Sequence, residues 1–303
     1  LGPQRLVPTL NVAVESLGVR GRIAAVTAGW EEREREDQEL SEHLGGRVVN
    51  LRIWERCEEI YRRDPDLFQA MRERRELLRR MQELYRLRLK HVLDAARSLL
   101  AREGEDALLE SERSAAIEDV RRLDAEHYER IRSVHADFDR TWRAGEREAV
   151  AEERAQLGAL LAQCSALCIA GGNVRVLLGR LRLLEVLRDW SGGPILAWSA
   201  GAMVISTRIV LFHDSPPQGA GNAEVYEAGL GRVGGVVPLP HARRRLQLDD
   251  CPRVMLFARR FGPDLCLALD ERTRADFVDG RWIGTVGTRC LRPEGVLAEV
   301  DAA

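Results

Sequence analysis

The stretch that decides the fold is PILAWSAGA, residues 194–202, in which an apolar run leads directly into a serine flanked by small residues. An apolar, helix-compatible segment, 203–205, follows it. A strand that turns sharply into a helix at a serine is a nucleophile elbow, and the turn needs small neighbours because bulky side chains would clash across it. The usual pattern is G-x-S-x-G, and Ala197 stands here in place of the first glycine. The stretch therefore predicts either a catalytic serine, Ser199, or an ordinary strand-to-helix turn.

Composition argues against several classes of protein. The 303-residue chain is 31% charged, yet its net charge is only −2, so a nucleic-acid binder driven by bulk charge is not expected. No apolar run reaches the roughly 18 residues of a membrane span, and residues 1–6 lack the layout of a signal peptide. The six cysteines are scattered, and the close pair Cys164 and Cys168 lacks partners at metal-binding spacing. We therefore expect buried free thiols, a cytoplasmic location and no metal site.

Both ends of the chain show the pattern of alternating strands and helices that is typical of an α/β protein. Short apolar runs at 22–29 and 47–51 predict two strands, with a helix over 31–44 between them. The order strand, helix, strand is typical of a mostly parallel sheet flanked by helices. Further strands are predicted at 166–173, 194–197, 209–212, 265–269 and 275–278, with a helix over 176–190.

The middle of the chain is helical instead. Residues 52–163 contain a single proline, Pro65, and their apolar residues recur every three or four positions on both sides of a break near Gly104. This pattern predicts two long amphipathic helices that form an antiparallel hairpin. The opening strands could not bury both faces of a sheet alone. We therefore expect residues 1–51 and 164–303 to form one α/β hydrolytic domain, interrupted by a helical insertion over 52–163.

A catalytic serine needs a base, and the base needs a carboxylate that orients it. Four of the six histidines lie in charged helical segments, which leaves His213 and His241. Two prolines stiffen the chain just before His241, so this residue is the predicted base. Asp214 is the predicted orienting carboxylate, although a residue in that place could also cap a turn. Glu224 and Glu227 are reserve orienters.

A glycine turn supplies the other expected part of the site. Gly171, Gly172 and Asn173 follow a predicted strand, where glycines let backbone N–H groups face a ligand. Together with the N–H of Ala200 they could form an oxyanion hole. Trp198, next to the serine, is counted with these candidate oxyanion and substrate-binding residues.

Taken together, these motifs resemble the dipeptidase E and cyanophycinase family of serine peptidases. The resemblance rests on the turn 171–173, the elbow 198–203 and the order of Asp214 and His241, and segment 268–273 is similar to the family's "DE-x-T" motif. It implies a class I glutamine-amidotransferase-like, flavodoxin-type fold with a serine where the amidotransferases use cysteine. It also implies that Gly172 contacts the oxyanion. The long helical insertion is not typical of the simple dipeptidases.

The predicted function is that of a serine hydrolase that cleaves a small peptide or amide bond through an acyl-enzyme, with no cofactor. The resemblance adds aspartyl or β-aspartyl substrates. The arginines at 243–245 could bind a substrate carboxylate, or they could be solvated and pair with Asp249 and Asp250. The alternative is a catalytically inactive scaffold whose helical insertion mediates dimerisation or partner binding. A homodimer is expected, and neither nucleic acid nor a membrane is expected as a partner.

Overall fold

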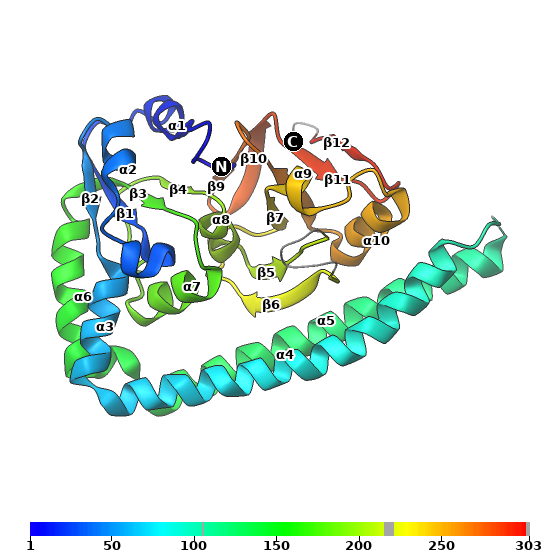
Figure 1. The fold of residues 1–303 in the computed structure, drawn as a ribbon, viewed down its shortest axis with the longest axis horizontal. Helices are drawn as coiled ribbons and strands as arrows, with labels where there is room; N and C mark the ends of the chain where they lie inside the picture. The colour runs from blue at the N-terminus through cyan, green and yellow to red at the C-terminus, as the bar shows by residue number, and fades with distance from the viewer. Residues whose placement is uncertain (105, 215–220, 301–303) are drawn as a thin grey trace.

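The computed structural model describes residues 1–104, 106–214 and 221–300. It has an α/β architecture built on a four-stranded parallel sheet with the strand order β2-β1-β3-β4 (Figure 1). The predicted fold class, a parallel sheet flanked by helices and interrupted by a long helical segment, is confirmed. The strands of this sheet are β1 (Arg22–Val26), β2 (Val48–Asn50), β3 (Cys164–Ile169) and β4 (Ile195–Ala197).

The two faces of the sheet are covered by different helices. Alternate residues of a strand point to opposite faces, and β1 accordingly divides its side chains between two apolar clusters. Ile23 packs with α1 (Leu10–Ser16), whereas Ala24 and Val26 pack with the cluster that contains α3 (Ile53–Arg63) and α7 (Val174–Leu183). All three residues are fully buried, as expected of a central parallel strand.

A second four-stranded sheet, with the order β12-β11-β8-β7, continues the molecule beyond β4. Its strands β7 and β8 run parallel, with Pro240 opposite Leu269, and the remaining pairs are antiparallel. Two separate antiparallel ribbons, β5-β6 and β9-β10, complete the strands of the described residues. The bounds are β5 (Arg208–Leu211), β6 (Glu224–Ala228), β7 (Val236–Pro240), β8 (Leu265–Leu269), β9 (Arg274–Val278), β10 (Arg281–Val286), β11 (Arg289–Leu291) and β12 (Leu297–Glu299).

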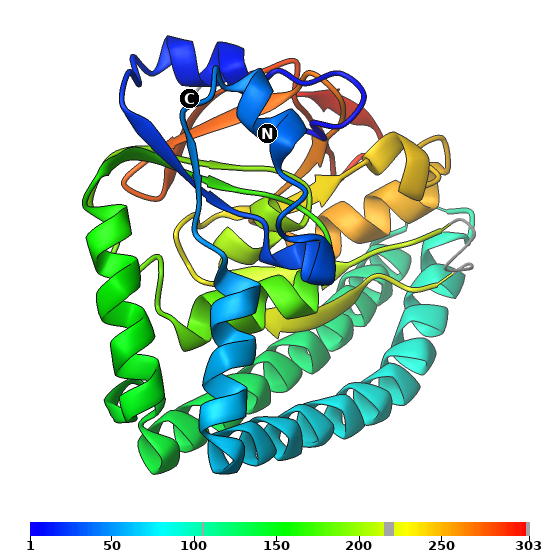
Figure 2. The ribbon, with the colours of Figure 1, turned by 60° about the vertical axis from the view of Figure 1, so that its left-hand side comes forward.

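The helices between β2 and β3 form the predicted hairpin. α4 and α5 run side by side beneath β6, and their tip extends past α10 (Cys251–Phe261) (Figure 1). The Asp64 side chain caps α4 by accepting from the N–H of Leu67, and Asp106 caps α5 through Leu109 in the same way. In the turned view, α3 and α6 connect the hairpin to the parallel sheet (Figure 2). The bounds are α3 (Ile53–Arg63), α4 (Pro65–Leu100), α5 (Ala107–Trp142), η2 (Ala144–Glu146) and α6 (Glu148–Leu161).

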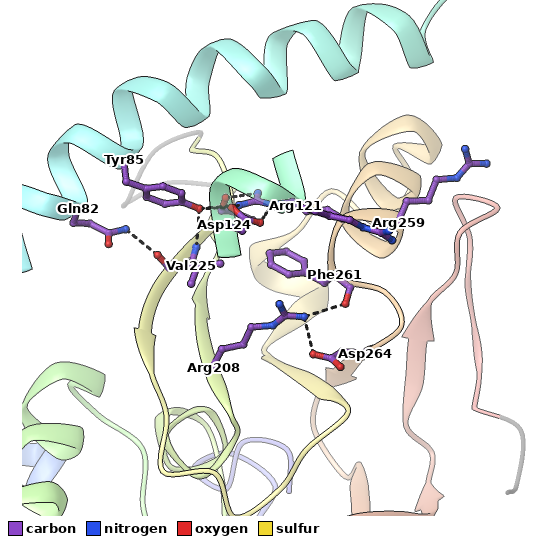
Figure 3. A network of polar contacts seen from close by, with 11 residues as sticks. Gln82, Tyr85, Arg121, Asp124, Arg208, Val225, Arg259, Phe261 and Asp264 are labelled. Carbon is purple, nitrogen blue, oxygen red and sulfur yellow. Dashed lines mark hydrogen bonds and ion pairs between the residues drawn. The ribbon is translucent and has the colours of Figure 1, made fainter. Parts of the chain in front are cut away.

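A buried polar network joins the hairpin to the rest of the molecule. Tyr85 of α4 donates to Asp124 of α5 at 2.7 Å, and the N–H of Val225 in β6 donates to the Tyr85 hydroxyl at 3.2 Å (Figure 3). Arg260 of α10 (Cys251–Phe261) binds Asp124 through two nitrogens, at 2.7 and 2.8 Å. The hairpin is therefore docked on β6 and α10. The proposed domain boundaries at residues 51 and 163 stay a prediction.

Two predicted helices are wrong in their extent. The helix expected over 176–190 is α7, which ends at Leu183, and the helix expected over 31–44 is divided. Residues 31–44 form two pieces, η1 (Ala28–Arg33) and α2 (Gln38–His43), in place of one helix. Gly29 lies so close to the glycine turn that a Cβ on it would be 2.4 Å from the carbonyl oxygen of Gly171, and Glu31 adopts a positive φ of 58°. Close packing against the turn and the positive φ of Glu31 thus disrupt the start of the expected helix.

No helix in the described part of the chain combines the length and the apolarity that crossing a membrane requires. Cys251 is exposed, against the expectation that all of the cysteine thiols are buried.

Candidate active site

Ser199 occupies the turn between β4 and α8 (Ala200–Ile205). Its φ and ψ are 51° and −124°, a combination that costs a non-glycine residue about 1–3 kcal/mol. Gly201 allows the turn, because a Cβ at that position would lie 2.2 Å from the carbonyl oxygen of Ile169 at the end of β3. Strain of this kind at a strand-to-helix serine is the geometry of a nucleophile elbow.

The structure brings His241 to this serine. The Ser199 Oγ lies 3.2 Å from the His241 Nε2, within the distance at which a base can take the hydroxyl proton. His241 directly follows β7, and its backbone N–H donates to the carbonyl of Leu269 at 3.1 Å, which extends the pairing with β8. Two segments 42 residues apart in the chain thus meet at the carboxyl ends of β4 and β7.

The surroundings of His241 favour its neutral form. The side chain is half-buried, and this burial is the largest cause that lowers the pKa of the imidazole below its usual value. The positive charges of Arg245 and Arg244 lower the pKa further, and the negative charge of Glu271 raises it in part. A neutral imidazole can accept the serine proton, whereas an imidazolium cannot.

The predicted orienting carboxylates are engaged elsewhere. The Asp214 carboxylate binds the guanidinium of Arg253 on α10 and accepts from the N–H of Gln247 at 3.3 Å. Within the described residues, none of Asp214, Glu224 and Glu227 has a hydrogen bond to His241. Residues 215–220, which include the turn expected after Asp214, lie outside the described residues.

Both reserve carboxylates bind the long hairpin or α7. Glu224 accepts from Arg86 of α4 at 2.6 and 2.9 Å, and from Gln82 of the same helix at 2.8 Å. The carboxylate of Glu227 lies 2.8 Å from His135 Nε2 of α5 and 3.5 Å from Arg182 of α7. Their contacts are those of residues that hold the hairpin against β6.

Sequence reasoning placed Glu271 only in the segment 268–273 that resembles the family motif, not among the orienters. Glu271 is exposed and has no hydrogen bond to His241 in the described structure, but its charge raises the pKa of the imidazole in part. Glu271 lies two positions beyond the end of β8. The strands β7 and β8 are parallel neighbours, and their pairing ends at Pro240 and Leu269. The carboxyl ends of parallel neighbours share one edge of a sheet. A search for acids just after the strand that pairs with β7 finds Asp270 and Glu271, and Asp270 is already bound to Arg243.

The glycine turn lies against the serine, as its position after β3 suggests. A Cβ on Gly171 would be 2.6 Å from the Ser199 Cβ and 3.5 Å from the Ala200 nitrogen. Gly172 has a φ of 106°, and a Cβ there would clash with the Gly29 carbonyl at 2.2 Å. The N–H groups of Gly171, Gly172 and Ala200 have no hydrogen-bond acceptor among the described residues. Free donors beside a nucleophile can hold a developing oxyanion.

The other two candidates, Asn173 and Trp198, make contacts that stabilise the backbone around the site. The Asn173 side-chain oxygen caps α7 by accepting from the N–H groups of Arg175 and Val176, while its amide nitrogen donates to Glu31 at 2.9 Å. Trp198 is buried in the apolar cluster that contains Leu10 of α1. Asn173 therefore fixes the glycine turn, and Trp198 anchors the elbow in the core.

The three arginines that follow His241, residues 243–245, differ in their contacts. Arg243 pairs with Asp270 at 3.7 Å, not with Asp249 or Asp250, and Asp250 instead caps α10. Arg245 is half-buried and has no ion pair or side-chain hydrogen bond within residues 1–104, 106–214 and 221–300. The expectation of pairing with the two later aspartates is therefore wrong. Arg244 is exposed and likewise has no such partner in the described chain, so Arg245 is the half-buried one of two unpaired cations near the base.

No group of three or more His, Cys, Asp or Glu residues in the described ranges is arranged to hold a metal ion.

Comparison with known proteins adds little to this geometry. No family model matches the chain, and no curated protein matches it. Among solved structures, the chain is similar to a crystal structure of a peptidase from an acI-B1 actinobacterium, with 21% sequence identity and a TM-score of 0.33. That match covers 55% of this chain and 72% of the other. The case for a function rests on the residues themselves.

Proposed function

We propose that this protein is a serine hydrolase that cleaves a small peptide or amide bond through an acyl-enzyme. The observation that carries the proposal is the 3.2 Å approach of the Ser199 Oγ to the His241 Nε2, with the serine in a strained elbow conformation. A strand-to-helix turn with a chance serine would need neither the strain nor a half-buried histidine at its hydroxyl.

Each residue has a defined part in the proposed reaction. His241 takes the proton as the Ser199 Oγ attacks the carbonyl carbon, and the N–H groups of Gly172 and Ala200 hold the oxygen that becomes negative. The tetrahedral intermediate collapses, the C–N bond breaks, and the imidazolium gives its proton to the leaving amine. Water then attacks the ester by the same route and releases the acid.

We assign the orienting carboxylate to Glu271, with Asp214 as the alternative. The support for Glu271 is its electrostatic effect on His241 and its place at the end of the strand paired with β7. The negative charge of Asp214 is largely satisfied by Arg253. An orienting carboxylate must stabilise the imidazolium, and a carboxylate already bound to a guanidinium does so less well.

The proposed substrates carry a carboxylate near the scissile bond, as aspartyl and β-aspartyl peptides do. Arg245 supports this assignment, because it is an unpaired, half-buried cation whose field reaches His241. A guanidinium can bind a carboxylate through two parallel hydrogen bonds, which gives both affinity and orientation.

Labelling with a fluorophosphonate probe tests the nucleophile and its base. We expect the wild type to label, and Ser199→Ala and His241→Ala to abolish labelling without loss of fold. Ser133→Ala is the matched control, because this serine is exposed on α5 and its loss should leave the rate unchanged. Labelling that survives Ser199→Ala, or a folded wild type that does not label, would contradict the proposal.

A pair of isosteric variants decides between the two carboxylates. Glu271→Gln should slow labelling at least about tenfold, since an orienting carboxylate fixes the imidazole and stabilises its charged form. Asp214→Asn should have a smaller effect on the rate. The opposite order would assign the orienting role to Asp214.

The scaffold alternative is favoured by one observation, the exposed apolar residues on the outer side of α4. The side chains of Leu84 and Leu87 are 65% and 64% exposed. They would suit a homodimer in which two hairpins pack together. Light scattering should then give a dimer that Leu84→Glu with Leu87→Glu dissociates, and a wild-type monomer at micromolar concentration would contradict this interface.

A further inference from the structure

A cleft of about 1070 Å³ opens at the base of the hairpin, away from the candidate active site. It lies between the start of α4, the end of α5, the end of α7 and the loop after β6, and its lining includes neither Ser199 nor His241. Sites for small molecules usually have volumes of roughly 300–1,000 Å³. The cleft is therefore large enough for a ligand the size of a nucleotide.

The lining of this cleft is strongly basic. Seven arginines face three carboxylates across it. Glu185 forms ion pairs with two of these arginines, Arg154 and Arg188, at 2.6 Å each. Arg74 and Arg232 have no ion pair or side-chain hydrogen bond with the residues that the structure describes. The guanidinium groups of Arg74 and Arg232 therefore have no counter-ion among the residues that the structure describes.

Arg74 is held in place although nothing neutralises it. Its guanidinium carbon lies 3.8 Å from the centroid of the Phe138 ring, and Phe138 is buried. Burial lowers the pKa of Arg74, and the charge of Asp139 opposes this shift only in part. A guanidinium stacked on a ring keeps its N–H edge available for an anion. Burying an unpaired charge costs free energy, which a bound anion would offset.

His135, in the wall of the cleft, adds a second unsatisfied group. Its Nε2 lies 2.8 Å from both the Glu227 carboxylate and the Arg182 guanidinium. Its Nδ1 is buried without a hydrogen-bond partner in the described chain. Glu227 can only accept and Arg182 can only donate, so the tautomer of His135 decides which of them Nε2 binds and whether Nδ1 is an unsatisfied donor or an unsatisfied acceptor. A water held beside a bound anion would satisfy Nδ1 in either tautomer.

We propose that this cleft binds a small anionic molecule that carries phosphate groups, at a site separate from Ser199. Guanidinium groups match the planar spacing of phosphate oxygens and form charge-assisted hydrogen bonds with them. Apolar residues of the lining, among them Leu181 and Leu187, offer contacts to the body of the ligand. The proposal does not depend on the chain being a hydrolase.

Isothermal titration with inorganic pyrophosphate at low salt tests the site. We expect saturable binding with one site per chain, weakened at least about tenfold in Arg74→Gln because a charge-assisted hydrogen bond is lost. Arg80→Gln removes the same charge from an exposed position of the same helix, and it should bind as the wild type does. Arg245→Gln should also bind as the wild type does, which separates this site from the cation beside His241.

Three results would overturn the proposal. One is an affinity that Arg74→Gln leaves unchanged while the variant keeps the wild-type melting temperature. Another is a loss of binding in Arg245→Gln, which would place the anion beside His241. The third is tighter binding of citrate than of pyrophosphate, which would exclude phosphate as the preferred group.

Discussion

Asp124→Asn should destabilise the protein far more than a surface change of the same chemistry. The Asp124 and Arg260 side chains are only 5% and 2% exposed, and two hydrogen bonds of 2.7 and 2.8 Å join them. The amide keeps the shape of the carboxylate and removes its charge, which leaves Arg260 buried without a counter-ion. Breaking a buried ion pair from one side costs about 3–5 kcal/mol.

The matched control is Asp119→Asn on the same helix. Asp119 pairs with Arg122 at 2.5 Å, but these side chains are 53% and 69% exposed. Exposed pairs of this kind contribute about 0–1 kcal/mol, because water screens them and the side chains must be ordered. Urea unfolding of both variants, followed by circular dichroism, gives the two changes in the free energy of unfolding.

A double variant separates the ion pair from packing. Replacing both partners, as Asp124→Leu with Arg260→Met, removes the uncompensated charge and should recover part of the loss seen in Asp124→Asn. Tyr85 keeps one partner in that variant, the N–H of Val225. The reasoning is refuted if Asp124→Asn costs no more than Asp119→Asn, or if the double variant is less stable than Asp124→Asn.

Three further predictions concern single positions. Arg245→Gln removes a charge that disfavours the imidazolium, so the pKa of His241 should rise and the pH at which probe labelling declines on acidification should move upward; an unmoved profile would contradict this. Burial lowers the pKa of His127 from 6.5 to about 4, so between these values the unfolded chain binds a proton that the folded chain does not. The melting temperature should therefore fall more steeply from pH 6.5 to 4 in the wild type than in His127→Gln. Equal slopes of melting temperature against pH in the two proteins would contradict this prediction. Gly171→Ala should reduce the rate of labelling roughly a hundredfold, because the new Cβ would collide with the side chain of Ser199. In the control Gly158→Ala, the new Cβ has no atom within 4 Å, so this variant should label at the wild-type rate.

The parts of the site that depend on short-range rules could be predicted from the sequence. The turn at Ser199 follows from an apolar run that meets small residues, and Gly201 is needed because the helix starts against the end of β3. The hairpin follows from two long helical patterns with a break near Gly104, since such patterns have few alternative structures. Just before the helix expected over 31–44, Gly29 packs against Gly171, about 140 positions away, and no local pattern contains such a contact.

The roles of side chains further from the serine required the tertiary structure. Trp198 is adjacent to Ser199 in sequence, yet its ring packs in the core with α1. Glu224 and Glu227 were plausible orienters by their order in the chain, but they lie on β6, against the hairpin. Sequence order does not say which strand a segment pairs with, and the pairing decides which side chains meet.

The choice between Glu271 and Asp214 illustrates the same point. Asp214 follows β5, whose only neighbour in the described residues is the antiparallel β6, and no rule brings the end of such a ribbon to the carboxyl edge of another sheet. His241 and Glu271 follow β7 and β8, which are parallel and in register up to their last residues. Residues that follow such a pair must emerge at one edge of the sheet. Once the pairing of β7 with β8 is known, an acid just beyond β8 is the natural partner for a base just beyond β7. The comparison of Glu271→Gln with Asp214→Asn therefore tests whether strand pairing or order along the chain is the better guide to the orienting carboxylate.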